Sequence, residues 1–212
     1  TVTYMIDGRM RHRDNQGNQG DLGPGSVQWM TAARGIVHEE MPQQENGMLW
    51  GYQLWINLPA AMKMGQPGYQ DIEAERIPGV TLDSGAQVRV IAGRFGDTVG
   101  PVADRPTEPH YLDVQLPMGT RFAWASPAGH TAFVQGVSGL TQVGSQVRPL
   151  RERELVMLGA GDRIELAAES DARVLIITGK PIGEPIAAYG PFVMNTPEEI
   201  RQAFDDFRSG RF

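Results

Sequence analysis

Two residues of one short extended run, His38 and Glu40, have the types and the spacing of a metal-binding pair. They belong to residues 36–40, which read as a short β-strand after Ala32-Ala33-Arg34-Gly35. Because side chains alternate between the two faces of a strand, residues two positions apart project from the same face. A neutral imidazole and a carboxylate suit Fe(II), Mn(II) and similar divalent ions. Two ligands alone do not hold a metal. The alternative interpretation is that His38 is a histidine at the edge of a sheet and Glu40 a solvated glutamate beside it.

The neighbouring Glu39 and the other three histidines are weaker candidates for a metal site. Glu39 should point to the opposite face and meet solvent or a cation. His12 stands between two arginines at the end of a predicted hairpin, and a cation would be repelled there, so we interpret His12 as part of a turn. His110 and His130 each lack a His-x-His or His-x-Glu companion. The second half of the chain is therefore predicted to be structural and free of metal.

Composition excludes several classes of protein. With 212 residues, 41% of them hydrophobic, the chain can form one large domain or two of about 100 residues. A net charge of −6 argues against non-specific nucleic-acid binding. The absence of cysteine excludes disulfides, zinc–thiolate sites and thiol catalysis. No membrane-spanning run or signal peptide is evident, so we expect a cytoplasmic protein, or a nuclear one if the source is eukaryotic.

Short β-rich runs separated by glycine and proline dominate the sequence. The 26 glycines and 15 prolines between such runs are typical of a barrel or sandwich. Asp7-Gly8 predicts a hairpin that pairs residues 1–6 with 9–13. Residues 59–80 show no sustained period and read as a link between two β-rich halves. Further strands are predicted over 26–30, 35–41, 48–58, 87–92, 111–116, 121–124, 132–137, 153–158, 162–166 and 173–178.

Only the tail, residues 196–207, has the pattern of a helix. Thr196 is a plausible N-cap and Pro197 suits the first helical position, with two glutamates in the first turn. The apolar stripe of this helix is expected to comprise Ile200, Ala203, Phe204 and Phe207.

Aromatic residues are interpreted mainly as core. The four tryptophans, Trp29, Trp50, Trp55 and Trp124, are expected to pack in barrel interiors. Gln53 and Asn57 lie on the less apolar face of residues 48–58. They are read either as polar groups near the site or as partners for buried backbone.

Three long segments of the sequence resemble the pirin family of the cupin superfamily. They are residues 1–42, which include GDLGPGSVQWMTAARGIVHEEMP, residues 54–72 with LWINLPAAMKM, and residues 190–210, GPFVMNTPEEIRQAFDDFRSG. The resemblance implies an all-β fold of two cupin-type β-barrels, a bicupin, with a C-terminal α-helix. Residues 1–72 would form the N-terminal barrel, 73–195 a metal-free C-terminal barrel and 196–212 the helix.

The resemblance also implies a mononuclear iron site held by three histidines and one glutamate. His38 and Glu40 occupy the two ligand positions of the motif GI-x-H-x-E-MP. The other two ligands, a His-x-His pair, are expected before Thr1 together with the first strands of the barrel. Whether that segment is missing or only unrecorded stays open, and a polypeptide that starts at Thr1 is expected to bind iron poorly.

The activity implied is that of a quercetin 2,3-dioxygenase, which opens the central ring of a flavonol with O2 and releases carbon monoxide. Glu40 would be both metal ligand and general base. Fe(II) is the expected cofactor, with Mn, Ni, Co or Cu as alternatives, in a monomer that contacts neither nucleic acid nor membrane. The alternatives are a non-catalytic, iron- or redox-responsive regulator that binds a protein partner, and an inert cupin that binds a sugar or small acid.

Overall fold

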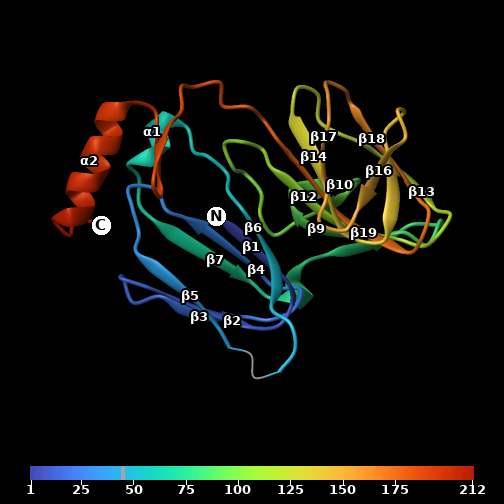
Figure 1. The fold of residues 1–212 in the computed structure, drawn as a ribbon, viewed down its shortest axis with the longest axis horizontal. Helices are drawn as coiled ribbons and strands as arrows, with labels where there is room; N and C mark the ends of the chain where they lie inside the picture. Colours follow the sequence, from blue (N-terminus) through green and yellow to red (C-terminus); the bar gives the residue numbers. More distant parts are fainter. Residues whose placement is uncertain (44–45) are drawn as a thin grey trace. The chain divides into compact units, whose positions relative to one another are not determined.

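The chain folds into two compact units that are built mainly from antiparallel strands. A computed structural model describes residues 1–43 and 46–212 (Figure 1). The first unit comprises Thr1–Arg76 and Ile182–Phe212, and the second comprises Ile77–Pro181. The predicted all-β class with a C-terminal helix is confirmed. Among the described residues, no helix has the length and apolar character needed to cross a membrane.

Two sheets form the body of the first unit. One has the order β6-β1-β4-β7, and the other has the order β3-β2-β5. The predicted hairpin at Asp7-Gly8 is wrong, because β1 and β2 join different sheets and the turn carries the chain from one to the other. The strands are β1 (Val2–Asp7), β2 (Met10–Asp14), β3 (Gln19–Leu22), β4 (Val27–Thr31), β5 (His38–Pro42), β6 (Trp50–Leu54) and β7 (Gly68–Ile72).

The predicted irregular link over residues 59–80 contains regular structure. A short helix α1 (Ala60–Lys63) is followed by β7, a 3-10 turn (Ala74–Arg76) and β8 (Gly79–Thr81). Strand β7 pairs with β4 along its whole length and buries Ile72. The link therefore supplies an edge strand of the first unit, which matters for the site described below.

The second unit encloses one apolar core between two sheets. Their orders are β17-β14-β19-β12-β9-β8 and β13-β18-β15-β16. The core cluster includes Val88, Leu112, Val134, Leu166 and Ile176, which come from both sheets. The remaining strands of this unit are β9 (Gln87–Ala92), β10 (Arg94–Phe95), β11 (Thr98–Val99), β12 (His110–Leu116), β13 (Arg121–Ala125), β14 (Thr131–Ser138), β15 (Leu140–Val143), β16 (Arg148–Arg151), β17 (Leu155–Met157), β18 (Arg163–Ala168) and β19 (Ala172–Gly179).

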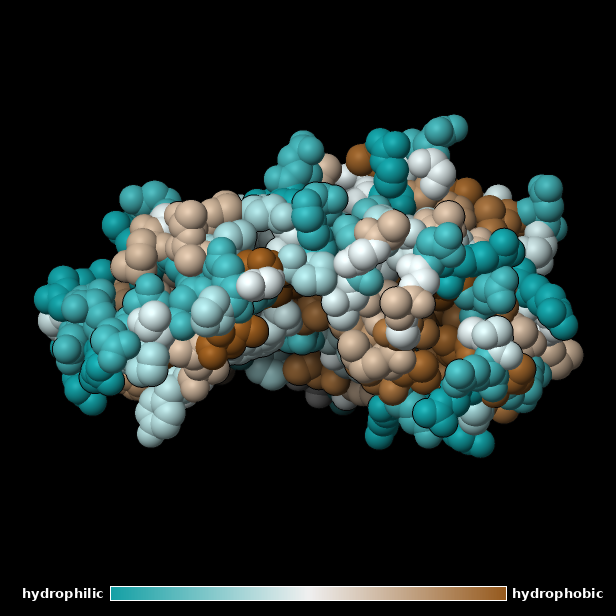
Figure 2. Space-filling view, turned by 90° about the horizontal axis from the view of Figure 1, so that it is seen from above, coloured by the Kyte–Doolittle hydropathy of each residue, from teal (hydrophilic) through white to brown (hydrophobic). Residues whose placement is uncertain are grey.

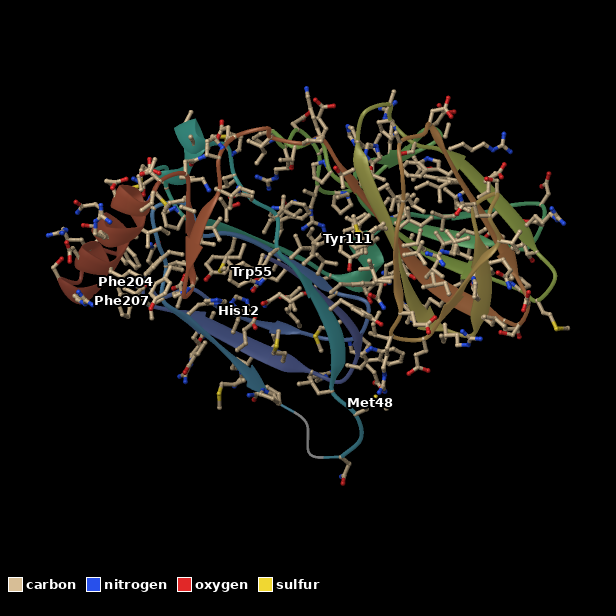
Figure 3. All side chains as sticks on the ribbon, turned by 45° about the horizontal axis from the view of Figure 1, so that its top comes forward. His12, Met48, Trp55, Tyr111, Phe204 and Phe207 are labelled. Carbon is tan, nitrogen blue, oxygen red and sulfur yellow. The ribbon has the colours of Figure 1, made fainter. Side chains whose placement is uncertain are left out.

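The C-terminal helix α2 (Pro197–Arg208) packs on a hairpin of β20 (Ala187–Tyr189) and β21 (Phe192–Met194). Its predicted N-cap is confirmed: Thr196 accepts a hydrogen bond from the backbone of Glu199, and the Glu199 side chain completes a capping box. The Phe204 ring lies 4.9 Å from that of Phe192, on the side of α2 that faces the hairpin (Figure 3). The outer surface of α2 is hydrophilic (Figure 2).

Residues 182–195, which precede α2, belong to the first unit. We expected them to be the end of the second barrel. The second unit ends at Pro181. Two polar contacts hold this segment to the first unit. The buried Lys63 ammonium donates to the carbonyl of Val193 at 3.0 Å, and Glu184 accepts a hydrogen bond from the backbone of Ala60 at 2.7 Å.

Candidate functional site

The predicted ligand pair lies on strand β5, beside strand β2. In the β2–β5 ladder Glu40 is directly opposite His12, and His38 is directly opposite Asp14. Residues that are paired across antiparallel strands project from the same face of the sheet, so all four side chains share one face. Glu39 points to the other face, as the alternation predicts, and forms an ion pair with Arg13 at 2.6 Å.

A row of polar side chains crosses the other sheet of the first unit. Gln53 is paired with Thr3, Thr3 with Gln28, and Gln28 with Asp71, so the row runs through β6, β1, β4 and β7. Thr3 and Gln28 are buried, whereas Gln53 and Asp71 at the two ends reach solvent. We call Gln53, Thr3, Gln28 and Asp71 the polar row. Its members contact Glu40 and His12, so the two sheets meet through polar groups at this point.

The polar row fixes the carboxylate of Glu40. The Gln53 side-chain amide donates to both carboxylate oxygens at 3.0 Å, and the Thr3 hydroxyl donates to Oε1 at 3.3 Å. Hydrogen bonds from fixed donors hold the carboxylate in one position. Of the two interpretations left open for Gln53, contact with the site is the one that the geometry supports.

His38 presents a nitrogen that has no partner in the described chain. Its Nδ1 atom is buried and makes no hydrogen bond with any described residue. Buried polar atoms without a protein partner are uncommon, and an ion or an ordered water molecule often satisfies them. One imidazole nitrogen and one carboxylate together match the donor types that divalent transition metals prefer. However, no group of three or more His, Cys, Asp or Glu side chains that could hold a metal is found among residues 1–43 and 46–212.

His12 is a buried strand residue, and its interpretation as part of a turn is wrong. It is only 1% exposed, and its Nε2 atom lies 3.1 Å from the Asp71 carboxylate (Figure 3 labels His12). Its ring stacks on Tyr69 with centroids 5.5 Å apart. The two flanking arginines do not reach it, because Arg11 and Arg13 project from the opposite face of β2 and bind Asp21 and Glu39.

Strand β7 supplies both partners of His12, and neither was predicted because the strand itself was not. Burial raises the pKa of Tyr69 above its ordinary value, and the nearby charge of Asp14 adds to this effect. Gly20 on β3 leaves the space for the His12–Asp71 contact. A Cβ atom at this position would overlap the His12 Nε2 atom and lie 2.7 Å from the Asp71 Oδ2 atom.

The two histidines of the second unit, which have no metal-binding companion nearby in the sequence, lie close together in the structure. The rings of His110 and His130 have centroids 6.0 Å apart. Both side chains are largely buried, and His130 lies 3.8 Å from Glu108. The prediction that the tryptophans lie in the core is correct for Trp29 and Trp124, which are buried. It is wrong for Trp55, whose side chain is 60% exposed.

Comparisons with known proteins identify the family. Residues 1–56 match the family described as Pirin, and residues 111–212 match the Pirin C-terminal cupin domain. A pirin-like protein of Caulobacter vibrioides is 47% identical over 213 residues, which cover all of this chain and 76% of that protein. A Pseudomonas aeruginosa protein with the provisional name quercetin 2,3-dioxygenase is 50% identical over 99% of this chain and 75% of its own length.

A solved structure agrees with the sequence relatives. The crystal structure of quercetin 2,3-dioxygenase from Acinetobacter baumannii superposes with a TM-score of 0.93 at 38% identity. The match covers 100% of this chain and 75% of that one. With two family matches and relatives of this identity over its whole length, the chain belongs to the pirin family, and residues 111–212 match its C-terminal cupin domain.

Proposed function

We propose that the protein is a metal-dependent quercetin 2,3-dioxygenase, which cleaves the central ring of a flavonol with O2 and releases carbon monoxide. The observation that carries this proposal is the shared face of His38 and Glu40 on β5, where Gln53 and Thr3 hold the Glu40 carboxylate. The similarity to a solved quercetin 2,3-dioxygenase supports the same activity.

His38 and Glu40 would hold a divalent cation, for which we propose Fe(II). The Nδ1 atom of His38, which forms no hydrogen bond with a described residue, and the oriented carboxylate of Glu40 fit such an ion by donor type. A bound cation of this kind acts as a Lewis acid that acidifies a coordinated hydroxyl group. The further ligands, a His-x-His pair before Thr1, stay a prediction.

Glu40 is proposed to take the proton of the flavonol 3-hydroxyl. Gln53 and Thr3 donate to its carboxylate, so the proton acceptor is held in place before a substrate arrives. A base that is already oriented spares the entropy of aligning it during the reaction.

The test compares three variants of the full natural chain loaded with Fe(II): His38→Ala, Glu40→Gln and Glu39→Gln. Quercetin loss, O2 uptake and carbon monoxide release are measured together. Loss of a general base lowers turnover by about 10²–10⁴-fold, so Glu40→Gln should be nearly inactive. Glu39→Gln is the matched control on the opposite face and should keep wild-type turnover.

Two outcomes would contradict the proposal. Carbon monoxide release that is unchanged in Glu40→Gln would place the chemistry elsewhere. Wild-type protein that binds the metal through His38 and Glu40 without consuming quercetin or O2 would favour the non-catalytic, metal-responsive regulator instead.

A further inference from the structure

A cavity of about 470 Å³ opens in the second unit, and nothing in the proposed dioxygenase chemistry uses it. All of its lining residues lie within Ile77–Pro181, so the cavity belongs to the second unit alone. The side chains that could recognise a ligand are Arg94 and Phe95 on β10, His110 at the start of β12 and Trp124 on β13. The volume falls within the range of about 300–1,000 Å³ that is usual for small-molecule sites.

His110 contributes a fixed hydrogen-bond acceptor. Its Nδ1 atom lies 3.2 Å from the backbone carbonyl of Glu108. A carbonyl only accepts, so Nδ1 carries the proton and Nε2 keeps its lone pair in the neutral ring. Burial lowers the pKa of His110, which keeps the ring neutral near pH 7. Nε2 forms no hydrogen bond with any residue that the structure describes.

The His110 ring has little freedom to move. It is 9% exposed and lies directly against the backbone of Gly93, where a Cβ atom would come within 2.6 Å of the ring. The ring of Trp124 also lies close to it, with the two centroids 5.4 Å apart. The acceptor is therefore held in position before any ligand binds.

Arg94 and the aromatic side chains supply the other two recognition elements. The Arg94 side chain is exposed and forms no ion pair within residues 1–43 and 46–212. Phe95 is stacked on Phe122, with centroids 5.9 Å apart and planes at 16°. Phe95 and Trp124 thus present apolar aromatic surface beside one cation and one neutral acceptor.

We propose that this cavity binds a monocyclic aromatic acid that carries a hydroxyl group, of the hydroxybenzoate class. The ring would pack on Phe95 and Trp124, the carboxylate would bind Arg94, and the hydroxyl would donate to Nε2 of His110. Guanidinium groups bind carboxylates through two parallel hydrogen bonds, and aromatic rings favour stacked or edge-on contacts. With Arg94 as the cation of the lining set, a monoanion fits better than a phosphate or a dicarboxylate.

The experiment is calorimetric titration of the protein with the three isomers of hydroxybenzoate. Benzoate, which lacks the hydroxyl, and 4-hydroxybenzamide, which lacks the charge, serve as comparison ligands. Each lost contact should weaken binding by about tenfold, because a hydrogen bond to a charged or buried group is worth roughly that factor. The best hydroxybenzoate isomer should therefore bind more tightly than both comparison ligands.

Variants assign each contact to its residue. Arg94→Met should weaken hydroxybenzoate binding by about tenfold and leave 4-hydroxybenzamide unaffected. His110→Gln should weaken hydroxybenzoate binding but not benzoate binding. Arg121→Met is the matched control, because Arg121 is also an exposed arginine of the second unit but does not line the cavity.

The proposal is overturned if none of the three isomers binds below about 1 mM. It is also overturned if Arg94→Met and Arg121→Met have equal effects, which would indicate only general charge attraction. Arg94 is exposed and its replacement leaves the core untouched, so this comparison remains decisive even if His110→Gln does not fold. The unfolding temperature of each variant is measured alongside its affinity.

Discussion

The Nε2 atom of His12 lies 3.1 Å from Oδ2 of Asp71, although 59 positions separate the two residues in the sequence. The other carboxylate oxygen of Asp71 accepts a hydrogen bond from the Gln28 amide at 3.0 Å. One side chain on β7 thus contacts two buried polar side chains, one from each sheet of the first unit. The body of this unit is held together partly by polar contacts, and these contacts adjoin Glu40.

Replacing Asp71 by alanine should lower the stability of the protein by about 1–3 kcal/mol, because it leaves the buried His12 and Gln28 groups without partners. Urea unfolding of Asp71→Ala measures this change. The control is Asp21→Ala, which removes another aspartate that binds a basic side chain, but in an exposed pair with Arg11. Exposed pairs contribute about 0–1 kcal/mol, so equal losses in the two variants would contradict our account of His12.

Gly20→Ala should be strongly destabilising, because the added methyl group would displace the His12–Asp71 contact. Over-packing of this kind typically costs about 1–3 kcal/mol. Gly23→Ala is the matched control, since a Cβ atom at Gly23 meets nothing within 4 Å. Thermal unfolding should separate the two variants clearly, and a Gly20→Ala protein as stable as Gly23→Ala would refute the packing argument.

Gln53→Ala should weaken metal binding although Gln53 is not itself a ligand. It removes the two 3.0 Å hydrogen bonds that orient the Glu40 carboxylate. Loss of such a supporting contact typically lowers metal affinity by about 10–100-fold. Equilibrium dialysis with elemental analysis measures the affinity, in the full natural chain. Gln115→Ala, an exposed glutamine of the second unit, should bind metal as the wild type does.

The stability of the second unit should depend on His110 at mildly acidic pH. Burial lowers the pKa of His110 in the folded state, while the hydrogen bond to the Glu108 backbone opposes this effect and the charge of Arg94 adds to it. As pH falls below about 6.5, the unfolded chain binds a proton at this residue before the folded protein does. Stability is therefore lost as pH falls through this range.

His110→Asn keeps a donor toward Glu108 but does not titrate, so it should lose less stability than the wild type as the pH is lowered from neutral to mildly acidic values. Urea unfolding at several pH values gives both curves. Parallel curves for the wild type and His110→Asn would show that His110 does not cause the acid sensitivity.

Local sequence patterns predicted most of the elements but not how they associate. Glycine and proline punctuation indicated the strands, and Thr196 with Pro197 marked the start of α2, because turns and caps depend on near neighbours. The prediction of a hairpin at Asp7-Gly8 was wrong because local patterns do not determine strand pairing. Turn residues determine that the chain reverses, whereas the sheet that each strand then joins depends on distant partners.

In the candidate site, too, local patterns predicted some features, whereas those that depend on distant partners could not be predicted. The alternation of strand residues placed His38 and Glu40 on one face, and alternation along β2 could also have indicated that His12 projects with Met10 rather than with the arginines. The polar row could not be predicted in this way. It exists only because four strands from separate parts of the chain align in register, and one of them, β7, is a five-residue strand that carries little apolar periodicity.

Strand β5 has β2 as its sole neighbour within the described chain, so the segment that carries His38 and Glu40 is a sheet edge. Such edges open locally at a lower free energy than the whole domain unfolds. His38 and Glu40 would leave a bound cation together in that single event, whichever other ligands hold it. A cation held there would in turn keep the edge closed, because it binds the closed form alone. Fraying of β5 would then be one step in metal release, and the backbone ladder to β2 would contribute to the lifetime of the loaded state beside the strength of the metal–ligand bonds.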